Sequence, residues 1–264
     1  MSDTNPYPEI KAVELQEFDR LNAYLRQLDA AGWEEQSYCS DWAIYQVVSH
    51  TASGARIGKM RLGAWVNGAP PLTREATQAV WDLFDSLGPQ TMLHEYLKAV
   101  GEYLAAERSI PDEAGLTEVE GFKGKQPLYV YQVARLWEMT SHTWDVYVAR
   151  DRNAQFCPEA VAILAARMHT LNLPIDPHRA ADFRERTVQF NLAGTPHTYL
   201  LDLSGDRPRL LAGEDPGATL VVEGPAEEVC RLLSGRHFVP GSHPEIEVAK
   251  GSNDDLVKLK RAFR

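Results

Sequence analysis

Cysteine is scarce in this chain of 264 residues, which contains only three, at positions 39, 157 and 230. An odd number of widely spaced cysteines predicts neither a disulfide framework nor a zinc site built from thiolates. We therefore expect Cys39, Cys157 and Cys230 to be reduced. A structural role is favoured for Cys230, which lies in an expected helix.

Positive charge and long apolar runs are also lacking. The chain has 27 Lys and Arg against 37 Asp and Glu, a formal charge of −10 and a pI near 5.3, so no basic surface is available to neutralise nucleic-acid phosphates. No apolar run approaches the roughly 20 residues that span a bilayer, and the first residues have neither the basic nor the apolar segment of a signal peptide. These absences exclude nucleic-acid and membrane partners and predict a cytoplasmic protein.

The hydrophobic pattern divides the chain into two parts. With 44% hydrophobic and 24% charged residues, the chain is expected to be globular, with domains at residues 1–152 and 153–264. In the first part, apolar residues recur at helical spacing and capping or proline signals mark the starts, which predicts a bundle of four long helices. The long helices are expected over residues 8–31, from Ser40 and Asp41 to beyond Ala55, from Gly88 and Pro89 to beyond Leu104, and from Pro127 onwards, with a short helix from Thr73 to about Ser86.

The second part changes period. A helix is expected from Pro158 to about Asn172, and beyond it apolar residues alternate with polar ones, as in β-strands. Residues 188–192 and 199–203 are expected to form a hairpin. Further strands near 209–211, 218–222 and 245–248, with helices at 225–233 and 254–263, predict a mixed α/β layer domain.

A carboxylate and an imidazole stand four residues apart in the helix expected after Pro127. Glu138 and His142 would share one helical face, with Cβ atoms roughly 5–6 Å apart, which suits two ligands of one divalent ion such as zinc. His50, three residues after Val47 on the apolar stripe of its own helix, is the candidate third ligand. The position of Glu138 beside apolar residues predicts a buried carboxylate, which would need a cation or several donors.

Less specific interpretations of these residues remain open. Glu138 and His142 also fit an ordinary surface pair at i,i+4 spacing, and His50 fits a hydrogen-bonded core histidine. Asp145, three residues after His142, is either a hydrogen-bond partner for a ligand imidazole or a plain helical acid.

The motifs around these residues resemble those of the mycothiol-dependent maleylpyruvate isomerase family. They are Ser40-Asp41-Trp42 followed by His50, Glu138-x-x-x-His142 followed by Trp144-Asp145, and the segment from Val222-Glu223-Gly224-Pro225 to Leu233-Ser234-Gly235-Arg236. The resemblance covers nearly the whole chain. It implies an N-terminal DinB-like metal-binding four-helix bundle and a C-terminal domain similar to sterol carrier protein 2. It also implies that His50, Glu138 and His142 bind the metal, usually zinc, with water or substrate in an open position.

The resemblance further implies a thiol cosubstrate. In such an isomerase a cofactor thiolate adds to an activated carbon–carbon double bond, the resulting single bond rotates, and elimination gives the opposite geometry. Neither ligand segment of this chain contains a cysteine, so the sulfur would come from the cofactor. Arg56, Arg135 and Arg236 are candidates for pairing the carboxylates of a substrate, although each also fits a solvated surface arginine. Arg236 is favoured by the resemblance, which implies a basic residue from the C-terminal domain.

These observations predict a metal-dependent enzyme, an isomerase or a thiol S-transferase, acting with a mycothiol-type thiol on a small anionic or electrophilic substrate. We expect a monomer or a homodimer. A metal-dependent hydrolase or lyase that uses no thiol is the second hypothesis. A non-catalytic binding protein with a structural metal is the third, but such a site is normally closed by a fourth protein ligand, and no obvious fourth ligand is present.

Overall fold

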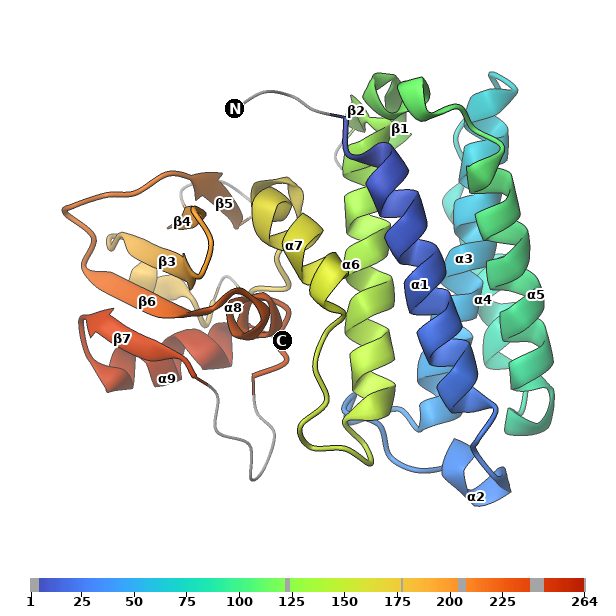
Figure 1. Cartoon of the computed structure of the whole chain (residues 1–264), viewed down its shortest axis with the longest axis horizontal. Helices are drawn as coiled ribbons and strands as arrows, with labels where there is room; N and C mark the ends of the chain where they lie inside the picture. The colour runs from blue at the N-terminus through green and yellow to red at the C-terminus, as the bar shows by residue number, and fades with distance from the viewer. Residues whose placement is uncertain (1–4, 122–123, 177, 204–207, 238–244, 264) are drawn as a thin grey trace. The chain divides into compact units, whose positions relative to one another are not determined.

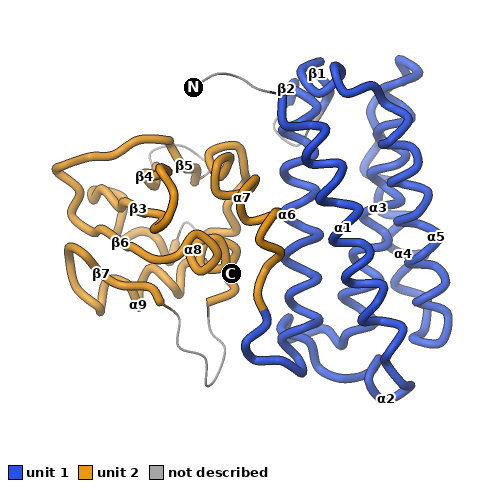
Figure 2. Tube along the Cα trace, viewed as in Figure 1, with its two compact units in different colours: residues 1–154 blue, residues 155–264 orange. Residues whose placement is uncertain are grey.

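The computed structural model of the chain describes residues 5–121, 124–176, 178–203, 208–237 and 245–263. The chain forms two compact units, residues 1–154 (unit 1) and 155–264 (unit 2), which Figure 2 shows in different colours. The boundary between these units lies two residues beyond the domain boundary expected from the sequence.

Unit 1 is built on four long helices that run side by side in Figure 1. α3 packs against α5 and α6, and α1 packs against α6 and α5. This arrangement agrees with the bundle expected from the helical periodicity. The long helices are α1 (Tyr7–Leu25), α3 (Ile44–Val66), α5 (Pro89–Arg108) and α6 (Leu128–Tyr147), and two shorter ones are α2 (Ala30–Trp33) and α4 (Arg74–Asp85).

One helix start that depends on proline and one that depends on a capping hydroxyl are confirmed. Pro89 opens α5, and the Thr73 hydroxyl accepts a hydrogen bond from the Ala76 amide at the start of α4. The single helix expected over residues 8–31 is wrong, because α1 ends at Leu25 and the Asp29 carboxylate caps the separate helix α2. The start expected at Ser40 and Asp41 is also wrong.

Helix α3 begins instead at Ile44, and its cap is formed by an unexpected residue. The Gln46 side-chain oxygen accepts a hydrogen bond of 2.9 Å from the Ala43 amide, so a residue within the first turn satisfies the amide before it. The loop before α3 therefore extends through Trp42 and Ala43. Residues of this loop contact another helix, because Cys39 is hydrogen-bonded to Asp145 of α6.

A small hairpin leads into α6, in the part of the chain where the sequence pattern predicted helices and no strands. After a 3-10 turn at Asp112–Leu116, β1 (Glu118–Gly121) pairs antiparallel with β2 (Gly124–Pro127). The Leu128 amide then donates to the Thr117 carbonyl, which ties the start of α6 to the hairpin. Val119 is the one large apolar side chain in these two strands, so no alternation of apolar residues marks them.

Unit 2 is a mixed sheet with helices, as the sequence predicted. Its five strands lie in the order β5-β4-β3-β6-β7; β3 runs parallel to β6, and the other neighbours are antiparallel. α8 contacts β3, β6 and α7. The strands are β3 (Val188–Ala193), β4 (Thr198–Asp202), β5 (Arg209–Ala212), β6 (Leu220–Pro225) and β7 (Glu247–Lys250), and the helices are α7 (Pro158–Arg167), α8 (Ala226–Leu233) and α9 (Asn253–Ala262).

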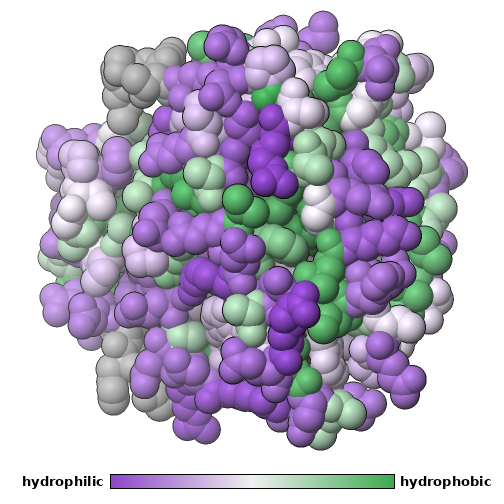
Figure 3. Space-filling model, turned by 45° about the vertical axis from the view of Figure 1, so that its right-hand side comes forward, coloured by the Kyte–Doolittle hydropathy of each residue, from purple (hydrophilic) through white to green (hydrophobic). Residues whose placement is uncertain are grey.

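The outer surface mixes charged and apolar side chains. Figure 3 shows a band of hydrophobic residues across the middle of one face, framed by hydrophilic ones. Within the described ranges, no helix has the combination of length and low charge that crossing a bilayer requires.

The core of unit 1 contains a cluster of buried polar residues that the hydrophobic pattern does not predict. Glu14 of α1, Glu107 of α5 and Gln132 of α6 are fully buried. Tyr103 donates to Glu14 over 3.0 Å, and the Gln132 amide donates to Glu107. Arg135 lies beside them, with its guanidinium carbon 5.5 Å from the centre of the Tyr103 ring. We refer to these five residues as the core polar cluster, which joins three helices.

Burial favours the protonated form of one acid in this cluster, Glu14. Desolvation, followed by repulsion from Glu107, raises the pKa of Glu14 well above its ordinary value of 4.5, and Arg135 opposes this only in part. Desolvation also raises the pKa of Glu107, but the interaction with Glu14 and the hydrogen bond from Gln132 oppose that rise, so Glu14 is the acid that holds the proton.

This proton makes the stability of unit 1 depend on pH. The pKa of Glu14 is higher in the folded chain than in the unfolded chain. The stability that this proton contributes is therefore fully present below pH 4.5 and is lost as pH rises through the folded pKa. Glu14→Gln retains a neutral donor to Glu107 and has no proton to release. As pH rises, we expect the free energy of unfolding of Glu14→Gln to increase relative to that of the wild type, by up to about 1.4 kcal/mol per pH unit.

Urea unfolding at pH 5 and pH 7.5 measures this difference. Glu9→Gln, at an exposed glutamate of the same helix, is the matched control and should leave the pH dependence unchanged. Parallel pH dependences of the wild type and Glu14→Gln would show that Glu14 does not hold the proton.

Candidate metal centre

Two helices of unit 1 bring together the three residues expected to bind a metal. α3 carries His50, and α6 carries Glu138 and His142 one turn apart. The Glu138 carboxylate oxygen Oε2 lies 3.7 Å from His50 Nε2 and 3.4 Å from His142 Nε2. The centres of the two imidazole rings are 4.8 Å apart.

These distances fit one small divalent ion. Zinc bonds of about 2.0–2.2 Å in a tetrahedral arrangement place neighbouring donor atoms about 3.3–3.6 Å apart. The three donor atoms lie within 4.8 Å of one another, and two nitrogens with one carboxylate oxygen form the donor set of many catalytic zinc sites. The residues therefore fit the metal that the family resemblance implies.

The exposure of the three ligands differs from the expectation for Glu138. Its side chain is 51% exposed, so the prediction of a buried carboxylate is wrong, whereas the His142 side chain is 11% exposed and that of His50 is 37% exposed. The residues next to Glu138 in α6 are buried. The Glu138 carboxylate itself contacts the imidazoles of His50 and His142 rather than apolar side chains, and the rest of its surface is exposed.

Hydrogen bonding fixes the charges of the unliganded site. Partial desolvation raises the pKa of Glu138, but hydrogen bonds from His142 and His50 outweigh it and hold the pKa well below the ordinary value. Desolvation lowers the pKa of His142, yet hydrogen bonds to Asp145, Cys39 and Glu138 together raise it well above the ordinary value. A cation held between the imidazoles and Glu138 is therefore favoured, whether it is a proton or a metal ion.

Asp145 contacts the His142 ring at Nδ1, the nitrogen opposite to the one that faces Glu138. It is fully buried, and its Oδ2 lies 2.8 Å from His142 Nδ1. With Nδ1 donating to Asp145, Nε2 of His142 faces Glu138 and His50, and its lone pair becomes available to a metal ion once the Nε2 proton is lost. Of the two sequence interpretations of Asp145, the geometry matches the hydrogen-bond partner.

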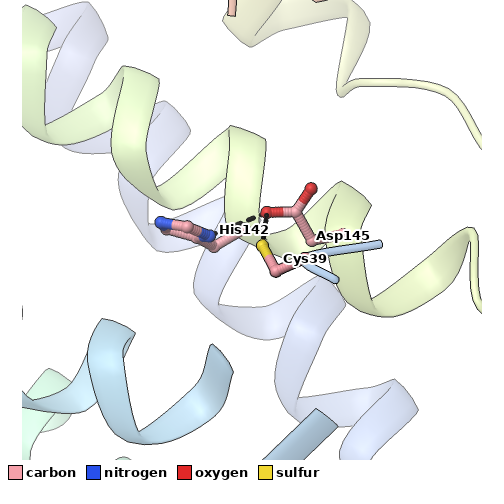
Figure 4. Close-up of side chains that lie close together, drawn as sticks. All are labelled: Cys39, His142 and Asp145. Carbon is pink, nitrogen blue, oxygen red and sulfur yellow. Dashed lines mark hydrogen bonds and ion pairs between the residues drawn. The ribbon is translucent and has the colours of Figure 1, made fainter. Parts of the chain in front are cut away.

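Cys39 is the neighbour that sequence reasoning missed. Its thiol donates to Asp145 Oδ2 over 3.3 Å, so Cys39 and His142 meet at the same carboxylate oxygen, as Figure 4 shows. The backbone of Tyr38 is also hydrogen-bonded to the Asp145 carbonyl. Cys39 is 106 residues away from Asp145, and no local pattern links the two.

The three candidate arginines have different surroundings. Arg56 of α3 forms an ion pair of 3.0 Å with Glu102 of α5. Arg135 is only 9% exposed and belongs to the core polar cluster, although its charge also acts on Glu138. Arg236 is in unit 2, where its guanidinium donates to the Ser234 carbonyl.

A cavity of about 510 Å³ opens beside His50 between α3 and α4. Trp42 lines it, and the Trp42 indole lies 5.1 Å from the His50 ring and 6.4 Å from the His142 ring, measured between ring centres. The metal centre therefore has space next to it that is formed entirely by unit 1.

Two kinds of similarity to known proteins are found. A family model described as the mycothiol maleylpyruvate isomerase N-terminal domain matches residues 15–147. A crystal structure of a mycothiol-dependent maleylpyruvate isomerase superposes with a TM-score of 0.63 at 20% identity, covering 94% of both chains. A mutant of such an isomerase, with a histidine replaced by alanine, gives a TM-score of 0.64 at 19% identity and the same coverage.

At these identities the crystal structures establish a shared fold. A comparison with curated proteins gives no match. The matched family segment extends over half of the chain and contains His50, Glu138, His142 and Asp145. The chain belongs to the mycothiol maleylpyruvate isomerase family, as defined by its N-terminal domain.

Proposed function

We propose that this chain is a divalent-metal-dependent enzyme that uses a low-molecular-weight thiol of the mycothiol type. Its reaction would be an isomerisation or an S-transfer on a small anionic or electrophilic substrate. The convergence of His50, Glu138 and His142 beside a cavity, in a member of this family, is the observation that carries the proposal.

His50, Glu138 and His142 would hold the ion, with zinc the metal implied by the donor set. Bound there, a divalent ion lowers the pKa of a coordinated thiol and polarises a carbonyl group. The surrounding residues have a distinct task. Asp145 keeps a proton on His142 Nδ1 and orients the ring, so that Nε2 is the nitrogen offered to the ion.

A substrate with carboxylates also needs a cation, and we propose Arg236 for it. The family resemblance implies a basic residue from the C-terminal domain, and Arg236 is the candidate in unit 2, whereas Arg56 and Arg135 belong to unit 1. Arg236 is half-buried in unit 2, and an arginine can offer two parallel hydrogen bonds to a carboxylate.

Metal binding provides the first test. The purified protein should bind about one divalent ion per chain, and His142→Ala should lose most of it because a principal donor is removed. Asp145→Asn should weaken zinc affinity by about 10–100-fold, because the His142 ring loses its orienting carboxylate. Metal content and competition titration with a chelator measure both effects. His94→Ala, at an exposed histidine of α5, is the control. Full occupancy in a His50→Ala/His142→Ala double variant would rule out the site.

Separation of the units tests whether unit 1 alone binds the metal and whether turnover also requires unit 2. A chain that stops after residue 154 contains all three ligands and should form a helical bundle that binds one ion. It should lack turnover, because Arg236 is absent. Metal analysis, circular dichroism and an activity assay distinguish these expectations. If the shortened chain turned over substrate as fast as the whole protein, the role of Arg236 would be wrong.

The thiol requirement can be tested with Cys39 removed as an internal source of sulfur. Turnover should vanish without added thiol in both the wild type and Cys39→Ser. Titration with thiol should change the visible spectrum of the cobalt-substituted protein at a pH well below the free thiol pKa of roughly 8.5. Thiol-independent turnover in the Cys39→Ser variant would favour the hydrolase or lyase hypothesis instead.

A further inference from the structure

The cavity between α3 and α4 combines flat aromatic surfaces with hydrogen-bonding groups. Tyr45 contributes an aromatic ring from α3, and Trp81 contributes one from α4 that is 38% exposed. Gln78 and Asp85 line the same cavity one turn before and after Trp81. At about 510 Å³, the cavity lies within the range of about 300–1,000 Å³ that is typical of small-molecule sites.

A buried hydroxyl on the wall of this cavity has no partner. Ser49 is 3% exposed, and its Oγ has no hydrogen-bond partner among the described residues. An unpaired buried hydroxyl costs free energy, and a ligand group that bonds to it removes the cost. Ser49 and His50 both line this cavity, so a molecule that fills it would also lie beside the proposed metal centre.

The charges of the cavity decide what kind of molecule it can bind. Its lining residues all belong to the described part of the chain and include no lysine or arginine, and Asp85 is their acidic member. A carboxylate or phosphate would therefore lose its hydration without gaining a cation. Neutral hydroxyl groups, in contrast, can donate to Asp85 and bond to Ser49 and Gln78.

We propose that this cavity binds the uncharged, polyhydroxylated body of the thiol cosubstrate, and that it excludes the anionic substrate. The apolar faces of sugar-like rings would lie against Trp81 and Tyr45, while their hydroxyl groups bond to Ser49, Gln78 and Asp85. The sulfur then extends past His50 to the metal centre. This inference rests on the proposed use of a thiol and adds which part of the chain selects it.

Two thiols that differ in their bodies test the proposal. Mycothiol carries a sugar-bearing body, and N-acetylcysteamine is a neutral thiol without it. In calorimetric titrations of the zinc-loaded full chain, mycothiol should bind at least about tenfold more tightly. Trp81→Ala should weaken mycothiol binding by about tenfold and Ser49→Ala by about fivefold, corresponding to one lost stacking surface and one lost hydrogen bond. Affinity for N-acetylcysteamine should be unchanged in both.

The controls separate this inference from the proposed function. Leu83→Ala, at an exposed residue of α4 outside the cavity, should bind both thiols like the wild type. Ser49→Ala should not lower the melting temperature, because its hydroxyl makes no bond within the described chain. Equal affinities for the two thiols in the wild type would overturn the cavity proposal alone. So would equal weakening of both thiols in the variants. Binding of neither thiol would overturn the proposed function as well.

Discussion

Compensation of desolvated charge along one side of α6 is the interaction on which unit 1 depends. The polar residues of this helix recur at steps of three and four, which keeps them on neighbouring turns of one side: Gln132, Arg135, Glu138, His142 and Asp145. The first two meet the acids of α1 and α5 in the core, and the last three lie at the candidate metal centre beside His50 of α3. The buried acids Glu14, Glu107 and Asp145 each have a hydrogen-bonding partner, and α6 supplies two of these partners, so the same helix supports both the packing of the bundle and its chemistry.

The position of α3 against this helix follows from small residues. A Cβ atom at Gly54 would lie 3.0 Å from the Arg135 guanidinium, and one at Gly58 would lie 3.1 Å from the Tyr103 ring. Glycine at these positions lets the core polar cluster fill the space beside α3. His50, one turn before Gly54, is thereby held at a distance from which its Nε2 reaches the carboxylate of Glu138.

Features encoded locally could be predicted from the sequence, and features that depend on distant contacts could not. The bundle, the β3–β4 hairpin and the sharing of one face by Glu138 and His142 follow from periodicity, proline and capping residues. The apolar stripe of α1 gave no sign that Glu14 is fully buried, because its partners Glu107 and Tyr103 lie on another helix. The contact of Cys39 with Asp145 depends on a loop whose path no local pattern specifies. Likewise, the cavity requires α3 and α4 to be brought together, although Ser49 and Trp81 are each unremarkable in sequence.

All of the proposed metal and thiol contacts lie in residues before the boundary at 154, and this has a consequence for how such proteins diversify. Mutations or exchanges in the C-terminal unit could change the substrate without altering the donor atoms, because the geometry of the donors is fixed within the bundle. The two parts of the gene could then change at different rates, because substitutions in the first part can alter the proposed metal donors and substitutions in the second part cannot. Relatives that share the bundle need not share a substrate.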